Sequence, residues 1–143
     1  YDYTLPGGYF VTICSYQRLP IFGEICDYTM VLNGAGRLAM QVWDSLTAKY
    51  DNIILDARVV MPNHFHGLLI IEEQKKSGLT QFIGWYKYQT TMMINQLWGT
   101  KGEQVWQRSF HDCIVRKPEA LVEYREYILG NPAQWAEDEY NRV

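Results

Sequence analysis

The sequence has few cysteines and no apolar run of membrane-spanning length. Cys14, Cys26 and Cys113 are odd in number and scattered, so they form neither a disulfide framework nor a cysteine-based metal motif. No apolar stretch approaches the roughly 20 residues that a bilayer requires. The sequence shows no basic segment followed by an apolar stretch at its start, which is the pattern of a signal peptide. These absences predict a protein of a reducing, cytoplasmic compartment with no membrane partner.

The sequence also has no overall excess of positive charge, since the formal net charge is −3. That argues mildly against nucleic acid as a partner. The charge is uneven, however: residues 74–117 carry seven basic and two acidic residues, a net charge of +5, between two acidic thirds. Phosphate contact depends on local potential, so this middle third is where DNA is expected to lie. A solvated face with uneven charge remains an equally good interpretation.

A chain of 143 residues with 48% hydrophobic residues predicts one domain, spanning 1–143. Hydrophobic periodicity and turn residues predict strands at 9–16, 53–61, 64–71 and 113–116, and helices at 31–50, 79–98 and from Pro118 to about Gly130. The order is that of an α+β, ferredoxin-like βαββαβ core with an antiparallel sheet. The first two helices are expected on one face, and the C-terminal helix near the other.

The sharpest local feature is a pair of histidines, His64 and His66, at the start of a predicted strand. Side chains alternate between the two faces of a strand, so both imidazoles point the same way, about 7 Å apart along the strand. Two such imidazoles can share one metal ion. The alternative is a pair of half-buried histidines in a sheet with no ligand.

A second feature lies in the C-terminal helix, where Tyr127 and Asn131 are four residues apart and therefore share a face. A tyrosine hydroxyl can attack a phosphodiester, and the Asn131 carbonyl oxygen is an acceptable hard ligand beside two imidazoles. The alternative is that Tyr127 only packs on an amphipathic helix. Tyr86, Tyr88 and Tyr124 are rival nucleophiles.

A third feature, at residues 105–112, sets aromatic residues beside a cation. Trp106 and Arg108 suit base stacking and phosphate contact, and Lys87 and Arg116 add cations from the same basic third. A packed loop explains residues 105–112 equally well. A third histidine, His111, has a context less suited to metal binding.

Taken in order, these motifs resemble those of the REP-associated tyrosine transposases, within the HUH group of single-tyrosine transposases. The resemblance rests on residues 61–66, 106–110 and 127–132 and on the opening residues 1–13, and it covers nearly the whole chain. It implies a divalent ion, Mg²⁺ or Mn²⁺, on His64, His66 and Asn131, and Tyr127 as the nucleophile. It also implies the βαββαβ core with the tyrosine on the last helix.

The activity implied by the resemblance is cleavage and strand transfer on single-stranded or hairpin-forming DNA, through a 5′-phosphotyrosine link. One alternative is a non-catalytic, single-stranded nucleic-acid-binding module, because RNA-binding domains share the same core order. A zinc-stabilised interaction domain is a third possibility, which the lack of a cysteine beside the histidines disfavours.

Overall fold

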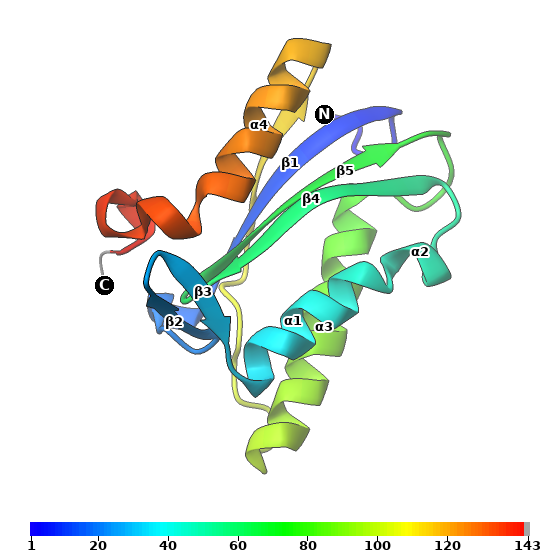
Figure 1. Cartoon of the computed structure of the whole chain (residues 1–143). Coiled ribbons are helices and arrows are strands. Elements are labelled where there is room, and N and C mark those ends of the chain that lie inside the picture. The colour runs from blue at the N-terminus through cyan, green and yellow to red at the C-terminus, as the bar shows by residue number, and fades with distance from the viewer. Residues whose placement is uncertain (142–143) are drawn as a thin grey trace.

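The computed structural model describes residues 1–141 and shows a four-stranded antiparallel sheet with helices on both faces (Figure 1). The sheet order is β4-β5-β1-β6. The strands of this sheet are β1 (Gly7–Cys14), β4 (Ile53–Met61), β5 (His64–Ile71) and β6 (His111–Val115). The helices are α1 (Gly34–Asp44), α2 (Leu46–Lys49), α3 (Leu79–Trp98) and α4 (Pro118–Gly130). This is the predicted ferredoxin-like core with its additional C-terminal helix.

The main hydrophobic core lies between the sheet and the pair α1 and α3 (Figure 1). Alternation along β1 sends Tyr9, Val11 and Ile13 into this core and turns Phe10 and Thr12 toward α4. The ring of Trp43 packs directly over Gly67 of β5, where an added Cβ would lie 2.5 Å from the Trp43 ring. The core face is therefore close-packed.

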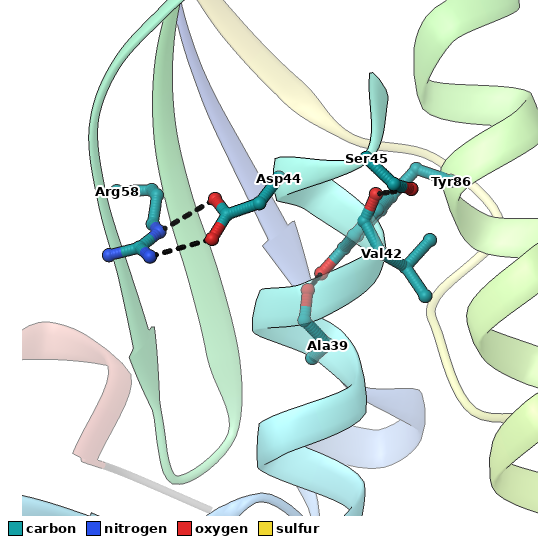
Figure 2. Close-up of polar contacts among 6 residues, drawn as sticks. All are labelled: Ala39, Val42, Asp44, Ser45, Arg58 and Tyr86. Atoms are coloured by element: carbon teal, nitrogen blue, oxygen red, sulfur yellow. Dashed lines mark hydrogen bonds and ion pairs between the residues drawn. The ribbon is translucent and has the colours of Figure 1, made fainter. Parts of the chain in front are cut away.

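Polar contacts fix α1 against the sheet and against α3 (Figure 2). The Arg58 guanidinium of β4 donates twice to the Asp44 carboxylate at the end of α1, at 3.0 and 2.8 Å. The Tyr86 hydroxyl of α3 donates to the Ala39 carbonyl at 2.8 Å. Both contacts join elements distant in sequence, so they hold the helical layer in one orientation.

The structure corrects several details of the predicted elements. Strands β1 and β6 each begin two residues earlier than the predicted 9–16 and 113–116. The helix expected at 31–50 is interrupted at Ser45, whose hydroxyl donates to the Val42 carbonyl, and only four residues of α2 follow (Figure 2). Residues 23–32 include a small hairpin of β2 (Gly23–Cys26) and β3 (Thr29–Leu32), neither of which is among the strands predicted from the sequence. The turn has positive φ at Asp27 and Tyr28, and because neither residue is glycine, the sequence gives no clear signal of this turn.

Helix ends match the prediction at most positions. Asn33 caps α1 by accepting from the Gly36 amide at 2.9 Å, and Gly99 ends α3 with φ of 71°. Helix α3 has the predicted bounds, Leu79–Trp98, and Gly78 is its N-cap. The Gln81 side chain accepts from the Gly78 amide at 2.8 Å. No helix within residues 1–141 is long and apolar enough to cross a membrane.

Helix α4 lies on the opposite face of the sheet from α1 and α3 (Figure 1). Its apolar attachment is small: Ile128 is fully buried, with Phe10 and Leu68, in a second and separate cluster. A bidentate ion pair adds to it, because Arg125 donates twice to Asp56 of β4, at 2.8 Å each. Asp56 lies where the β4–β5 register is interrupted by a bulge.

Candidate active site

The two predicted histidines lie side by side on β5, in the centre of the sheet. His64 and His66 are 0% and 1% exposed, and their ring centroids are 4.6 Å apart. They pair across the sheet with Cys14 and Thr12 of β1, on the face that α4 covers. The alternation inferred from the sequence thus brings both imidazoles to one place.

Neighbouring side chains fix the outer nitrogen of each ring. The Nδ1 atom of His64 lies 2.9 Å from Asn63 Oδ1, and that of His66 lies 2.9 Å from Thr12 Oγ1. The Asn63 amide nitrogen donates to the carbonyls of Tyr140 and Arg18, so its oxygen must face His64. That oxygen can only accept, so Nδ1 of His64 carries the proton and Nε2 carries a lone pair.

Three buried polar atoms at this point have no hydrogen-bond partner among the described residues: His64 Nε2, His66 Nε2 and Asn131 Oδ1. Asn131 is itself only 2% exposed. Buried polar atoms are nearly always satisfied, so such a group of acceptors requires an explanation. Two imidazole nitrogens and an amide oxygen are suitable ligands for a divalent cation, and the residues therefore fit one.

The histidines are held neutral by their surroundings. Burial lowers the pKa of His64 to about 2, with the neighbouring His66 charge adding to the effect and the Asn131 side chain opposing it. Burial likewise lowers the pKa of His66 to about 4, partly offset by a hydrogen bond with the Val11 backbone. A neutral imidazole is the form that ligates a metal, so the site needs no deprotonation near neutral pH.

Tyr127, the predicted nucleophile, lies beside the histidine pair. It lies one helical turn before Asn131, is 40% exposed, and its ring centroid is 5.4 Å from that of His66. Tyr124 stacks on Phe10 at 4.6 Å, and its hydroxyl faces Cys113, whose hydrogen bond raises the Tyr124 pKa. Tyr86 is fully buried in the other face, and Tyr88 is on α3.

The segment after α4 folds back over the histidines. It forms two short 3₁₀ turns, Pro132–Glu137 and Glu139–Asn141. The Tyr140 ring lies 4.5 Å from the His64 ring, and the Trp135 ring lies 6.1 Å from it. The Arg18 guanidinium lies 5.3 Å from the Tyr140 ring centroid. The tail therefore packs its aromatic rings against His64.

Comparison with known proteins assigns the family. The model of the family described as "Transposase IS200 like" matches residues 30–131, well over half of the chain. The chain belongs to this family. It is also 30% identical to an uncharacterized protein of Haemophilus influenzae, over 97% of this chain and 87% of the relative. The family predicted from the sequence motifs is confirmed.

Two solved structures share the fold of this IS200-like transposase. A REP-associated tyrosine transposase bound to a REP hairpin superposes with a TM-score of 0.68 at 17% identity, over 93% of this chain and 70% of the other. A Deinococcus radiodurans protein, provisionally described as a transposase, superposes with a TM-score of 0.59 at 13% identity, over 90% and 93% of the two chains. At these sequence identities, both similarities are evidence for the fold alone.

The residues predicted to touch DNA are dispersed over the transposase. Arg108 and Arg116 are exposed at opposite ends of β6. The Lys87 ammonium donates to the carbonyls of Gln107 and Ser109, at 2.7 and 2.9 Å, and so stabilises that loop. Trp106 is 3% exposed and donates to Thr90, so its ring has no face left on which a base could stack.

Sequence reasoning missed the partners that orient the site. Asn63 and Thr12 hold the histidine rings, Asp56 anchors Arg125, and Tyr140 closes over His64. Strand alternation gave a usable signal for Thr12, since it shares a face with Phe10 along β1. The other three depend on contacts between distant segments. His111, predicted to be a poor metal ligand, lies on β6 across β1 from His66: both residues pair with Thr12, and both line a cavity beside α4.

Proposed function

We propose that this protein is a metal-dependent transferase that cuts and rejoins single-stranded DNA through a covalent link to Tyr127. The observation that carries the proposal is the set of three buried, unpaired acceptors beside a tyrosine on the adjoining helix. A non-catalytic binding module would have no evident use for such a set. Family membership supports action on DNA.

The cation would be held by His64 Nε2, His66 Nε2 and Asn131 Oδ1, and Mg²⁺ or Mn²⁺ is proposed as the working ion. When bound, such an ion polarises the scissile phosphate as a Lewis acid. The protein's own contribution is orientation, because Asn63 and Thr12 fix the imidazole rings from behind. The tail residues Trp135 and Tyr140 reduce access of water to the site.

The reaction is a transesterification. The Tyr127 hydroxyl loses its proton to solvent, and its oxygen forms a bond to phosphorus. The bond from phosphorus to the 3′ oxygen breaks, and that oxygen takes up a proton as a free 3′-hydroxyl. The 5′ end of the other fragment remains on Tyr127 as a phosphotyrosine. Attack by a later 3′-hydroxyl reverses the step and joins strands without a nucleotide cofactor.

The substrate is proposed to be a hairpin with a single-stranded flank. The solved relative in the same fold is bound to a REP hairpin, which supports this class of DNA. The exposed cations Arg108 and Arg116 flank the sheet edge at β6 and offer phosphate contacts along it. Trp106 and Lys87 have packing roles in this fold, so we assign phosphate contact first to the two arginines.

The test is Tyr127→Phe, with Tyr124→Phe as the matched control on the same helix. Tyr127→Phe retains the ring, so folding and Mn²⁺ binding should survive, whereas the detergent-resistant protein–DNA adduct should vanish. Tyr124→Phe should still form the adduct. Wild-type adduct should require Mg²⁺ or Mn²⁺ and disappear with chelator, and peptide mapping should place the DNA on Tyr127. An adduct that persists in Tyr127→Phe refutes the assignment.

A further inference from the structure

A cavity of about 590 Å³ lies next to the proposed nucleophile, between α4 and the edge strand β6. Its lining includes Phe10 and Thr12 from β1, and His66 and Tyr127 from the site itself. The volume is in the range of small-ligand pockets. Because Tyr127 and His66 belong to its wall, anything bound there would lie beside the scissile phosphate.

Helix α4 presents one face to this cavity. Ala120, Glu123, Tyr124 and Tyr127 are spaced i, i+3, i+4 and i+7, so they form a single stripe, and all four line the cavity. The small Ala120 side chain leaves room between the helix and β6. The nucleophile is thus the last member of the stripe that forms the cavity wall.

The lining suits a flat aromatic ligand. The Phe10 ring is stacked with the Tyr124 ring at 4.6 Å and 17°, and with the His66 ring at 5.1 Å and 25°. Phe10 and His66 are 8% and 1% exposed, so they only support this stack; the half-buried Tyr124 ring and the exposed Tyr127 ring are the ring surfaces on which a base can stack. Polar groups at hand are the Glu123 carboxylate, the Cys113 thiol and the His111 ring. An apolar platform with a few polar groups is what a nucleobase requires.

The charges of the lining favour a base over a phosphate in the part of the cavity beside Glu123. Neither lysine nor arginine is among the residues that line the cavity, whereas Glu123 and Asp112 are. Asp112 already accepts from the Tyr3 hydroxyl at 3.1 Å, which leaves the Glu123 carboxylate as the acceptor for a ligand. A carboxylate accepts from an exocyclic amine, which adenine, cytosine and guanine carry and thymine lacks.

We infer that the cavity between α4 and β6 binds the unpaired nucleobase next to the scissile phosphate and selects, through Glu123, a base with an exocyclic amine. This inference rests on the proposed cleavage at Tyr127. It adds a specificity determinant that phosphate contacts cannot provide, because phosphates carry no sequence information. Losing one charge-assisted hydrogen bond should weaken the preference about tenfold.

The first experiment uses hairpins whose single-stranded flanks are randomised. Covalent adducts formed with Mn²⁺ are isolated, and the bases on either side of the cut are sequenced. Wild-type protein should disfavour thymine at one flanking position. Glu123→Gln should reduce that preference about tenfold, because the amide can also donate to thymine, and Glu126→Gln on the same helix should behave as wild type. An unchanged preference in Glu123→Gln overturns the inference and leaves cleavage intact.

The second experiment does not depend on cleavage. A single 2-aminopurine in an oligo-dT strand loses fluorescence when it stacks on aromatic side chains. The emission should be quenched by wild-type protein and by Tyr127→Phe, but not by Tyr124→Leu, with Tyr88→Leu on α3 as the control. Quenching without adduct would refute catalysis and retain the base site. Absence of quenching by wild-type protein overturns the base site, whether or not adduct forms.

Discussion

The attachment of α4 through Arg125 and Asp56 should control the rate of the proposed reaction more than it controls stability. The helix carries both Tyr127 and Asn131, yet its apolar anchor is the small cluster around Ile128. The bidentate pair to Asp56 therefore accounts for much of its fixed orientation. Replacing Arg125 with Met retains the apolar stem and removes the pair.

The free energy lost in Arg125→Met can be estimated from how far the ion pair is buried. The side chains of Arg125 and Asp56 are 40% and 18% exposed, so the pair is intermediate between an exposed and a buried one. Exposed pairs contribute about 0.2–1 kcal/mol, and breaking buried ones costs about 3–5 kcal/mol. We expect a loss of about 1–2 kcal/mol, concentrated in the docking of α4. That loss lowers the ratio of docked to undocked helix by about 5- to 30-fold, and where the two states are close in free energy it lowers the docked fraction by about 3- to 15-fold.

The matched control is Arg58→Met on the opposite face. Arg58 also forms a bidentate pair, with Asp44, and the two side chains are 33% and 48% exposed (Figure 2). Both variants are compared in urea unfolding and in single-turnover adduct formation. Arg125→Met should slow adduct formation at least about threefold, whereas Arg58→Met should leave it unchanged. Equal rates in the two variants would refute the argument that the pair positions Tyr127.

Three further predictions concern the proposed metal site and the core on the other face of the sheet. Calorimetry with Mn²⁺ should show one ion per chain, lost in His64→Ala and in His66→Ala and weakened less in Asn131→Ala, since a neutral oxygen contributes less than an imidazole; undiminished binding in both histidine variants would remove the metal assignment. In chelator, the free energy of unfolding should fall as pH drops below about 6.5. The two histidines bind protons there in the unfolded chain but stay neutral in the folded one, where their pKa values are lowered to about 2 and 4. Urea melts from pH 7.5 to 5 measure this, and a flat profile contradicts it. Gly67→Ala should cost roughly 1–3 kcal/mol in the same melts, because the new methyl meets the Trp43 ring; a wild-type midpoint would show that the ring moves aside freely.

Features set by local periodicity were predictable from the sequence. Alternation along a strand placed His64 and His66 on one face, and helical spacing placed Asn131 one turn after Tyr127; the structure shows both. Strands β4 and β5 were predicted with the bounds that they have, because proline and asparagine separate two apolar runs.

Features set by contacts between distant segments were not predictable. The bonds from Asn63 and Thr12 to the histidine rings require the sheet register and the return of the tail. Trp106 is of a residue type that can stack on bases, but only the fold shows that its ring packs against Phe22 and Tyr86. A single sequence does not distinguish these uses of an aromatic side chain.

The separation of the two clusters on either side of the sheet has an evolutionary consequence. The large core with α1 and α3 contains none of the proposed reacting atoms, and the small cluster under α4 contains few of the stabilising ones. Substitutions along α4 can therefore change strand chemistry or base choice while the scaffold continues to fold. A lineage that loses Tyr127 would keep the sheet and its histidine pair, from which a DNA-binding regulator without cutting activity could arise.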